Sequence, residues 1–156
     1  MKNVLFYLAS FVALTLSLAL TQAEMPRVDG LISVASPYGV TETIDRVAQV
    51  AEAKGFTLVA RVDHAAAASK VDMTLAPTEL LIFGNPKGGT PLMQCQQVLG
   101  LELPLKVLAW EQASGEVLLS YNDPQFLATR YGASCDDVVT NISNALQGIV
   151  QEALAQ

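Results

Sequence analysis

The stretch Leu80–Met93 reads Leu-Leu-Ile-Phe-Gly-Asn-Pro-Lys-Gly-Gly-Thr-Pro-Leu-Met, and the fold is organised around it. Its first four residues, Leu80–Phe83, form the short apolar run of a buried strand. Gly84–Gly89 follows with three glycines and a proline, which predicts a tight turn. A helix is then expected to begin at Thr90-Pro91, with Thr90 as the N-cap residue and Pro91 at the favoured first helical position.

This turn is a candidate site for an anion. The backbone N–H groups of a glycine-rich turn that leads into a helix attract negative charge, and the ammonium group of Lys87 adds to that attraction. The expected ligand-binding residues are Asn85, Lys87, Gly88, Gly89 and Thr90, with Lys106 as a second cation. A nucleotide P-loop is excluded, because Thr90 stands where that motif requires lysine. The alternative is a structural role, in which the glycines permit positive φ and Thr90 only caps the helix.

The rest of the chain alternates strands with helices. Strands are expected at Leu31–Ser36, Phe56–Asp63, Leu80–Phe83, Leu105–Glu111 and Glu116–Tyr121, the last two as an antiparallel hairpin. Helices are expected from Thr41 to before Gly55, over Pro91–Leu99, over Pro124–Tyr131 and over Ser134–Ala153, while Ala65–Asp72 fits either a helical turn or a loop. This order predicts an α+β two-layer sandwich, a mostly antiparallel sheet with helices packed on it.

The first 23 residues are typical of a secretory signal peptide. Lys2 provides the positive start, Val4–Leu20 is apolar, and small residues precede a cleavage site after Ala23. An uncleaved membrane anchor is the alternative, since a span needs roughly 20 apolar residues. We therefore expect a periplasmic or secreted protein whose single domain covers residues 24–156, with no further contact with the membrane.

The mature chain is acidic. Without Lys2, eight basic and fifteen acidic side chains remain, a net charge of about −7. Such a surface repels phosphate backbones, so nucleic acid is not an expected partner. The two cysteines, Cys95 and Cys135, enter an oxidising compartment together. Whether they form a disulfide depends on their separation in space, which the sequence leaves open.

Catalytic candidates are few. His64, the single histidine, follows Asp63 at a strand end, and Asp123 precedes Pro124. His64 and Asp123 would supply acid–base chemistry with Lys87 as electrophile, although Asp123 also fits a helix N-cap and Lys106 also fits a side chain extending past Leu108 and Trp110 to solvent. Neither a C-x-x-C nor an H-E-x-x-H motif occurs, so no metal or other cofactor is expected.

Several pieces of the chain resemble a known family. They are Phe83–Met93, Leu103–Lys106, Ser120–Pro124 and Val62–Ala66, and the similarity extends over about Gly30 to Leu154. The chain resembles the DUF302 family of bacterial and archaeal domains of unknown function. The resemblance implies a compact α+β domain in a fold class shared with TATA-binding-protein-like domains. It implies no activity and no functional residues, and Cys95 departs from the family pattern.

Three functions follow as hypotheses. The favoured one is a non-enzymatic binding or interaction module that takes a small anionic ligand at Gly84–Thr90 and forms a homodimer. The second is a small-molecule enzyme that uses His64, Asp123 and Lys87. The third is a structural partner in the cell envelope.

Overall fold

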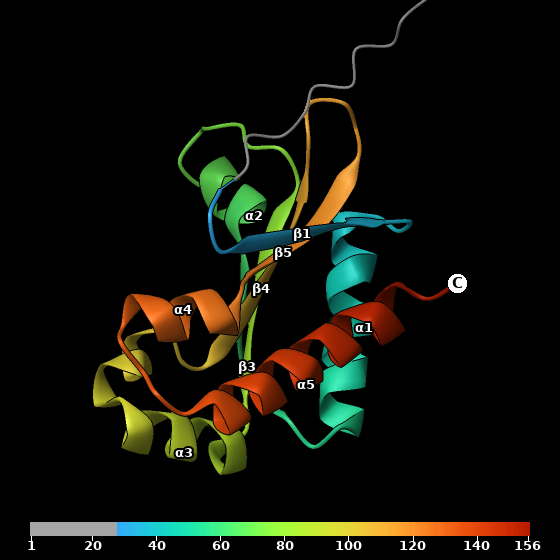
Figure 1. Ribbon diagram of the computed structural model, residues 1–156. Coiled ribbons are helices and arrows are strands. Elements are labelled where there is room, and N and C mark those ends of the chain that lie inside the picture. Colours follow the sequence, from blue (N-terminus) through green and yellow to red (C-terminus); the bar gives the residue numbers. More distant parts are fainter. Residues whose placement is uncertain (1–27) are drawn as a thin grey trace, which may run out of the picture.

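The computed structural model describes residues 28–156, which form one five-stranded antiparallel sheet with helices on one face and at both ends (Figure 1). The predicted signal peptide and its cleavage site lie outside these residues. The elements are β1 (Leu31–Ser36), α1 (Val40–Ala53), β2 (Thr57–Asp63), α2 (His64–Ser69), β3 (Thr78–Gly84), α3 (Pro86–Cys95), the 3₁₀ helix η1 (Gln97–Leu101), β4 (Leu105–Glu111), β5 (Val117–Asn122), α4 (Pro124–Arg130) and α5 (Asp136–Leu154). The predicted α+β class is confirmed.

The strand order in the sheet is β1-β5-β4-β3-β2, so β4 is the central strand and β1 and β2 are its edges. The expected hairpin joins β4 to β5, and Gly115 takes the positive φ that its loop requires. All four strand pairs are antiparallel. The chain therefore crosses from β1 to the far edge through α1 and then returns strand by strand.

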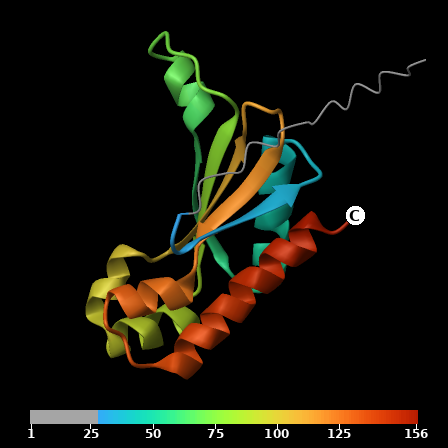
Figure 2. The same cartoon turned by 45° about the horizontal axis from the view of Figure 1, so that its top comes forward.

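The main core lies between one face of the sheet and the helices α1 and α5. The apolar residues Ile44, Val47 and Ala51 of α1 recur at helical spacing, and all three are fully buried. They pack with Leu81 and Phe83 of β3, together with Val107, Ala109, Leu119, Tyr121, Leu146 and Ile149. Figure 2 shows α5 running diagonally beside α1, with α2 projecting beyond one end of the sheet.

A second apolar cluster lies at the end of the sheet where β3 and β5 end and β4 begins. Leu92 of α3, Leu99 of η1 and Ala128 of α4 pack there against Val139 and Ile142 of α5. The long helix α5 takes part in both clusters, which is why its buried apolar residues extend over the full length of the helix.

The glycine-rich segment differs from the prediction. It is not a turn: α3 already begins at Pro86, four residues before the expected start, and Pro91 lies inside the helix. Asn85 is the N-cap residue and Pro86 takes the first helical position, so the Asn-Pro pair starts the helix that Thr90-Pro91 was expected to start. The helix ends at Cys95 rather than Leu99.

Two smaller expectations about β2 and α1 are also wrong. Leu58 and Ala60 are two residues apart in the expected strand, which predicts that they share one side of it, but a bulge between them turns the two side chains to opposite sides of the sheet. Thr41 does not cap α1, which begins after Gly39; its hydroxyl donates to Glu79 instead. The undecided segment after His64 forms the short helix α2.

Candidate functional site

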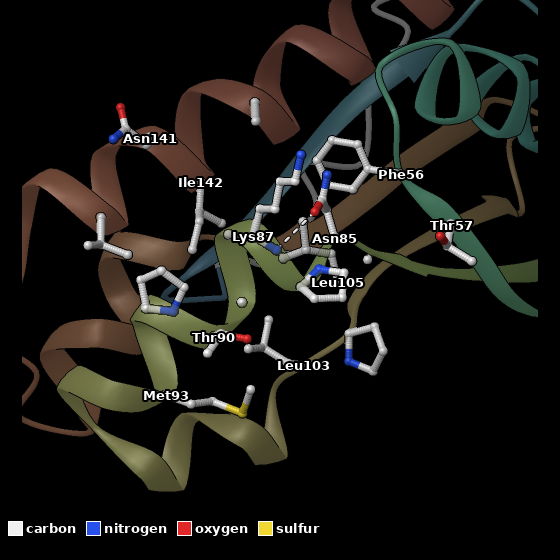
Figure 3. Close-up of a pocket in the computed structure, with 18 of the residues that line it drawn as sticks. Phe56, Thr57, Asn85, Lys87, Thr90, Met93, Leu103, Leu105, Asn141 and Ile142 are labelled. Carbon is white, nitrogen blue, oxygen red and sulfur yellow. Dashed lines mark hydrogen bonds between the residues drawn. The ribbon is translucent and has the colours of Figure 1, made fainter.

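A groove with a volume of about 690 Å³ runs alongside α3 (Figure 3). One wall is α3 itself, a second is the N-terminal half of α5, and the others come from the start of β2 and the segment before β4. Its lining is Phe56, Thr57, Val59, Gly84–Pro91, Met93, Gly100, Leu103–Leu105, Val138, Asn141, Ile142 and Ala145. This volume is typical of a pocket for a small organic ligand, whose usual range is about 300–1,000 Å³.

The glycines beside the groove permit close packing. A Cβ atom on Gly84 would lie 3.1 Å from Cβ of Pro104, and one on Gly89 would lie 3.4 Å from Cδ1 of Leu103. Gly84, Gly88 and Gly89 do not adopt the positive φ that the structural alternative proposed. Small residues are needed here because Leu103-Pro104 approaches α3 closely.

The backbone N–H groups that were expected to bind an anion already donate hydrogen bonds within the protein. The N–H group of Lys87 donates to Oδ1 of Asn85 at 3.0 Å, and those of Gly88 and Gly89 both donate to the Asn85 carbonyl oxygen at 3.0 Å. The first turn of α3 therefore offers no free amide at these three residues. The interpretation of this segment as an anion-binding backbone nest is wrong.

The side chain of Lys87 is the cation that remains. It is exposed, extends along the groove beside Phe56 in Figure 3, and makes no ion pair with any of residues 28–156. The side-chain nitrogen of Asn85 donates to the Gly55 carbonyl oxygen at 3.0 Å, which ties the start of α3 to the start of β2. Five of the six predicted ligand-binding residues thus line one groove: Asn85, Lys87, Gly88, Gly89 and Thr90.

Lys106, the sixth, does not join them. Its ammonium group donates to the carbonyl oxygens of Glu102 at 2.8 Å and Pro104 at 3.2 Å. It lines only a second, much smaller cavity of about 40 Å³. The predicted second cation therefore stabilises the turn before β4 instead of facing the ligand groove.

The two catalytic candidates lie apart from each other and from the groove. His64 is exposed at the start of α2, while Asp123 caps α4 by accepting from the Gln125 N–H at 2.9 Å. Asp63, the residue before His64, pairs with Glu79 near the start of β3, whereas Lys87 follows the end of β3. The length of that strand, about 20 Å, separates His64 from Lys87, so the predicted catalytic trio is not assembled. Among residues 28–156 no group of three His, Cys, Asp or Glu side chains is placed to hold a metal ion.

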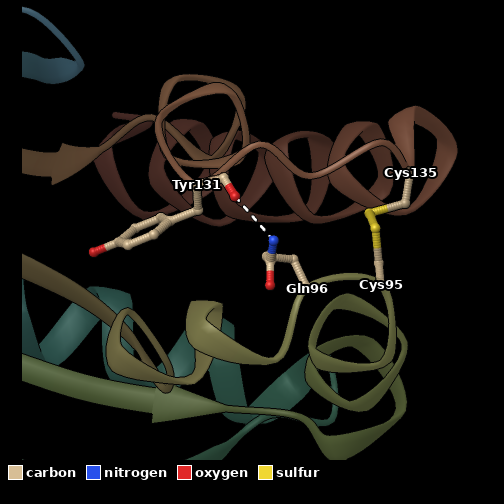
Figure 4. The surroundings of a disulfide bond; sticks show 4 residues. All are labelled: Cys95, Gln96, Tyr131 and Cys135. Atoms are coloured by element: carbon tan, nitrogen blue, oxygen red, sulfur yellow. Dashed lines mark hydrogen bonds between the residues drawn. A yellow bond between two sulfur atoms is a disulfide. The ribbon is translucent and has the colours of Figure 1, made fainter.

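The disulfide that the sequence left open is present. Cys95 and Cys135 are bonded with their Cα atoms 6.3 Å apart, which joins the end of α3 to the residue before α5 (Figure 4). The side chain of Gln96 adds a hydrogen bond to the Tyr131 carbonyl oxygen at 3.0 Å. Since α3 and α5 form two walls of the groove, this cross-link holds those walls together at one end.

Two tyrosines, Tyr121 and Tyr131, have raised pKa values. The hydroxyl of Tyr131 donates to the Glu102 carboxylate at 2.7 Å, and this hydrogen bond raises the pKa of Tyr131. Burial raises the pKa of Tyr121, with a further contribution from the negative charge of Asp123. Both tyrosines therefore keep their protons to higher pH than an exposed tyrosine.

Sequence reasoning missed the far wall of the groove. The sequence places Val138, Asn141, Ile142 and Ala145 only within the helix expected over Ser134–Ala153, and Phe56 only in a strand. No local signal marks these residues, because their role depends on α5 packing beside α3. Apart from the segment Gly84–Met93, the lining residues that lie in a piece resembling the family are Leu103–Leu105.

These features define a class of protein: a two-layer α+β domain with one face of an antiparallel sheet covered by helices and an apolar groove beside a short helix. The chain belongs to the family described as Domain of unknown function DUF302, which matches residues 32–151. The fold agrees with a solved structure described as an uncharacterized conserved DUF302 protein from Bacillus stearothermophilus. That structure has a TM-score of 0.73 and 16% identity, covering 81% of this chain and 99% of that one.

Other relatives carry a functional name. The chain is 50% identical over 109 residues to a protein of Brucella suis biovar 1 named fluoride-specific ion channel FluC 1, covering 69% of this chain and 43% of the relative. A protein of the same name from Brucella abortus biovar 1 matches at 50% identity over 109 residues, 40% of its length. The chain thus spans less than half of these curated relatives. Within residues 28–156, no helix combines the length and apolar character needed to cross a bilayer.

Proposed function

We propose that this protein is a non-enzymatic binding module for a small amphipathic anion. The apolar part of the ligand would lie in the groove beside α3, and its carboxylate or similar head group would pair with Lys87. The observation that carries this proposal is the position of Lys87, an exposed cation without an ion-pair partner in the described chain, on the wall of a largely apolar groove of about 690 Å³.

The chemistry of the groove favours an organic anion over a small inorganic one. A compact, strongly hydrated ion needs several converging donors to replace its water. The N–H groups at the start of α3 are occupied by Asn85, so Lys87 provides one charged contact. An apolar chain in contact with Ile142, Leu103 and Phe56 would provide most of the binding free energy.

Linear carboxylates test this proposal directly. Decanoate is expected to raise the melting temperature of the protein and to bind in isothermal titration calorimetry. Lengthening the chain from octanoate to decanoate should tighten binding about tenfold, since each buried CH₂ contributes about 0.8 kcal/mol. Decanol and decyltrimethylammonium, which share the chain but lack the anion, should bind more weakly.

Variants separate the two parts of the site. Lys87→Ala should weaken decanoate binding about two- to fivefold while leaving decanol unaffected, because an exposed ion pair contributes about 0.5–1 kcal/mol. Ala145→Phe should block the groove for both ligands. Lys70→Ala is the matched control, an exposed lysine at the end of α2, near the start of β3 and away from Lys87 at its end. Equal binding of decanoate by the wild type, Lys87→Ala and Ala145→Phe would refute the proposal.

A second candidate function rests on the curated relatives. More than half of each Brucella protein lies outside the match, and the matched part of this chain has no membrane-spanning helix in the described residues. We infer that the match covers a module that accompanies the channel portion of those proteins. We also infer that this chain serves as a similar module beside a membrane protein. Its location would be periplasmic or secreted, as its expected signal peptide predicts.

A domain exchange tests this second function. The matched part of the Brucella suis relative would be replaced by the corresponding residues of this chain, and fluoride efflux from liposomes would be compared with that of the intact relative and of a version lacking the module. Retained efflux in the exchange, with reduced efflux in the deletion, is expected. Equal efflux in all three would argue against an accessory role.

A further inference from the structure

The groove beside α3 opens at a free edge of the sheet. Within residues 28–156, β2 is an edge strand that pairs with β3 alone. Thr57 and Val59 of this strand line the groove, yet both are exposed, Val59 by 58%. The mouth of the groove therefore lies where the outer backbone groups of β2 meet solvent.

These backbone groups make the mouth chemically different from the apolar interior of the groove. In an antiparallel sheet, successive residues of an edge strand direct their N–H and C=O groups alternately toward the partner strand and away from it. A hydrocarbon chain would cover the outward groups of β2 without pairing with them, which is costly. An extended peptide pairs with such groups by adding a strand to the edge.

The charges of β2 leave only this end of the strand open to pairing. Charged side chains on an edge strand oppose the addition of another strand. Those of β2 are Arg61 and Asp63 in its second half, whereas the first half, Thr57–Ala60, has none. The bulge lies in this first half: Val59 has no partner in β3, and it lines the groove. The uncharged half of the edge and the groove thus adjoin each other.

Lys87 fixes the direction of a peptide bound here. Figure 3 shows the Lys87 side chain beside Phe56, the residue that precedes β2. The side chain of Asn85 ties the start of α3 to Gly55 at the same place. A chain whose terminal carboxylate pairs with Lys87 therefore ends at the start of β2, and along the edge it runs antiparallel to that strand. All four strand pairs of the sheet are antiparallel, so the added strand would continue the pattern.

We propose that the ligand of the groove is the apolar C-terminal end of another polypeptide, an inference that rests on the proposed function and names its amphipathic anion. The terminal carboxylate pairs with Lys87, the last side chains fill the groove, and the preceding residues add an antiparallel strand to Thr57–Ala60. At about 3.3 Å per residue, the recognised segment is about five residues long. It carries no further carboxylate, because this chain has a net charge of −6 and would repel one.

The peptide acetyl-Ser-Thr-Val-Ser-Leu tests this in isothermal titration calorimetry with protein purified from full-chain expression. It should bind, and decanoate should displace it from the groove. Amidation of its C-terminus should weaken binding about two- to fivefold, as loss of an exposed ion pair does. Lys87→Ala should weaken binding of the free acid by the same factor and leave the amide unaffected. Lys70→Ala, an exposed lysine away from the groove, should change neither.

Backbone methylation tests the added strand without any change to the protein. Two versions of the peptide carry N-methyl groups on alternate amides, so that one version blocks the amides facing β2 and the other blocks those facing away. One version should bind about tenfold more weakly or worse, because it loses its hydrogen bonds to the edge. The other should bind nearly as well as the unmethylated peptide.

Amide hydrogen exchange locates the peptide on the protein. The peptide should slow exchange over Thr57–Ala60, whereas decanoate, which has no backbone groups, should not. Exchange over Leu31–Ser36 in β1, the other edge strand, should stay unchanged with either ligand.

Each result decides the proposal. Displacement by decanoate, a loss in one methylated version alone and slowed exchange over Thr57–Ala60 support it. Decanoate binding without peptide binding overturns it and leaves the proposed function standing, whereas binding of neither ligand removes both. Peptide binding that decanoate does not displace overturns it, as do equal affinities of the two methylated versions and protection of β1 in place of β2.

Discussion

Oδ1 of Asn85 accepts a hydrogen bond from the backbone N–H of Lys87 at 3.0 Å, and this contact marks where α3 begins. The same side chain donates to the Gly55 carbonyl oxygen at 3.0 Å. One residue thus starts the helix, fixes it to the edge of the sheet and places Lys87 in the first helical turn, on the wall of the groove.

Asn85→Ala should lower the free energy of unfolding by about 1–2 kcal/mol, because the helix loses its cap and its tie to Gly55. Asn85→Asp should recover the cap but not the donor to Gly55, so its stability should fall between the two. Urea denaturation of the three proteins measures this order. If alanine proves as stable as asparagine, the capping account of α3 fails.

The Cys95–Cys135 disulfide closes a loop of 40 residues, so reduction should lower the free energy of unfolding by about 3–4 kcal/mol. Because the bond joins two walls of the groove, reduction should also weaken decanoate binding. Calorimetry with and without a reductant gives both quantities. A Cys95→Ser, Cys135→Ser double variant serves as the control, since reductant should leave it unaffected.

Glu79 is a buried carboxylate, only 6% exposed, held by three donors. The Nε atom of Arg61 donates to Oε2 at 2.7 Å, a second guanidinium nitrogen lies 2.6 Å from the same oxygen, and the Thr41 hydroxyl donates to Oε1.

Glu79→Ala removes the acceptor of these hydrogen bonds but leaves Arg61, whose side chain is 37% exposed, in contact with water, so it should cost about 1–3 kcal/mol of stability. Glu116→Ala, an exposed position beside the β4–β5 hairpin loop, should change stability by less than about 0.5 kcal/mol. Guanidinium denaturation compares the two variants. Similar small losses in both would show that the pair contributes little.

The raised pKa values of Tyr121 and Tyr131 predict a loss of stability at alkaline pH. The folded state holds these protons more tightly than the unfolded state, where tyrosine titrates near its ordinary value of 10.0. Their stabilising contribution is therefore complete below that value and is lost as pH rises through the folded-state pKa values.

Ultraviolet titration of tyrosinate, combined with urea unfolding between pH about 8 and about 11, checks this direction. Glu102→Gln should bring the pKa of Tyr131 back toward its ordinary value, because the charged acceptor is gone. An unchanged tyrosine titration in that variant would show that the Glu102 contact does not raise the pKa.

The sequence by itself determined the fold class, the strands and most of the helices. Periodic apolar residues such as Ile44, Val47 and Leu146 must face a core wherever the chain places them, and turn residues such as Gly115 and Asp123-Pro124 act on their immediate neighbours. These are local properties of the chain. The misplaced start of α3 was a local error too, since Asn85-Pro86 competed with Thr90-Pro91 for the same role and the earlier pair began the helix.

Only the tertiary structure decided what the candidate residues do. Packing brought Cys95 to Cys135, turned Lys106 toward backbone carbonyls, set His64 and Lys87 at opposite ends of β3, and added Asn141 and Ile142 of α5 to the wall of the groove. These outcomes depend on contacts between residues far apart in the chain, and no periodicity or motif encodes such distances. The sheet order likewise placed the crossover helix α1 and the C-terminal helix α5 on the same face of the sheet, where both pack into the main core.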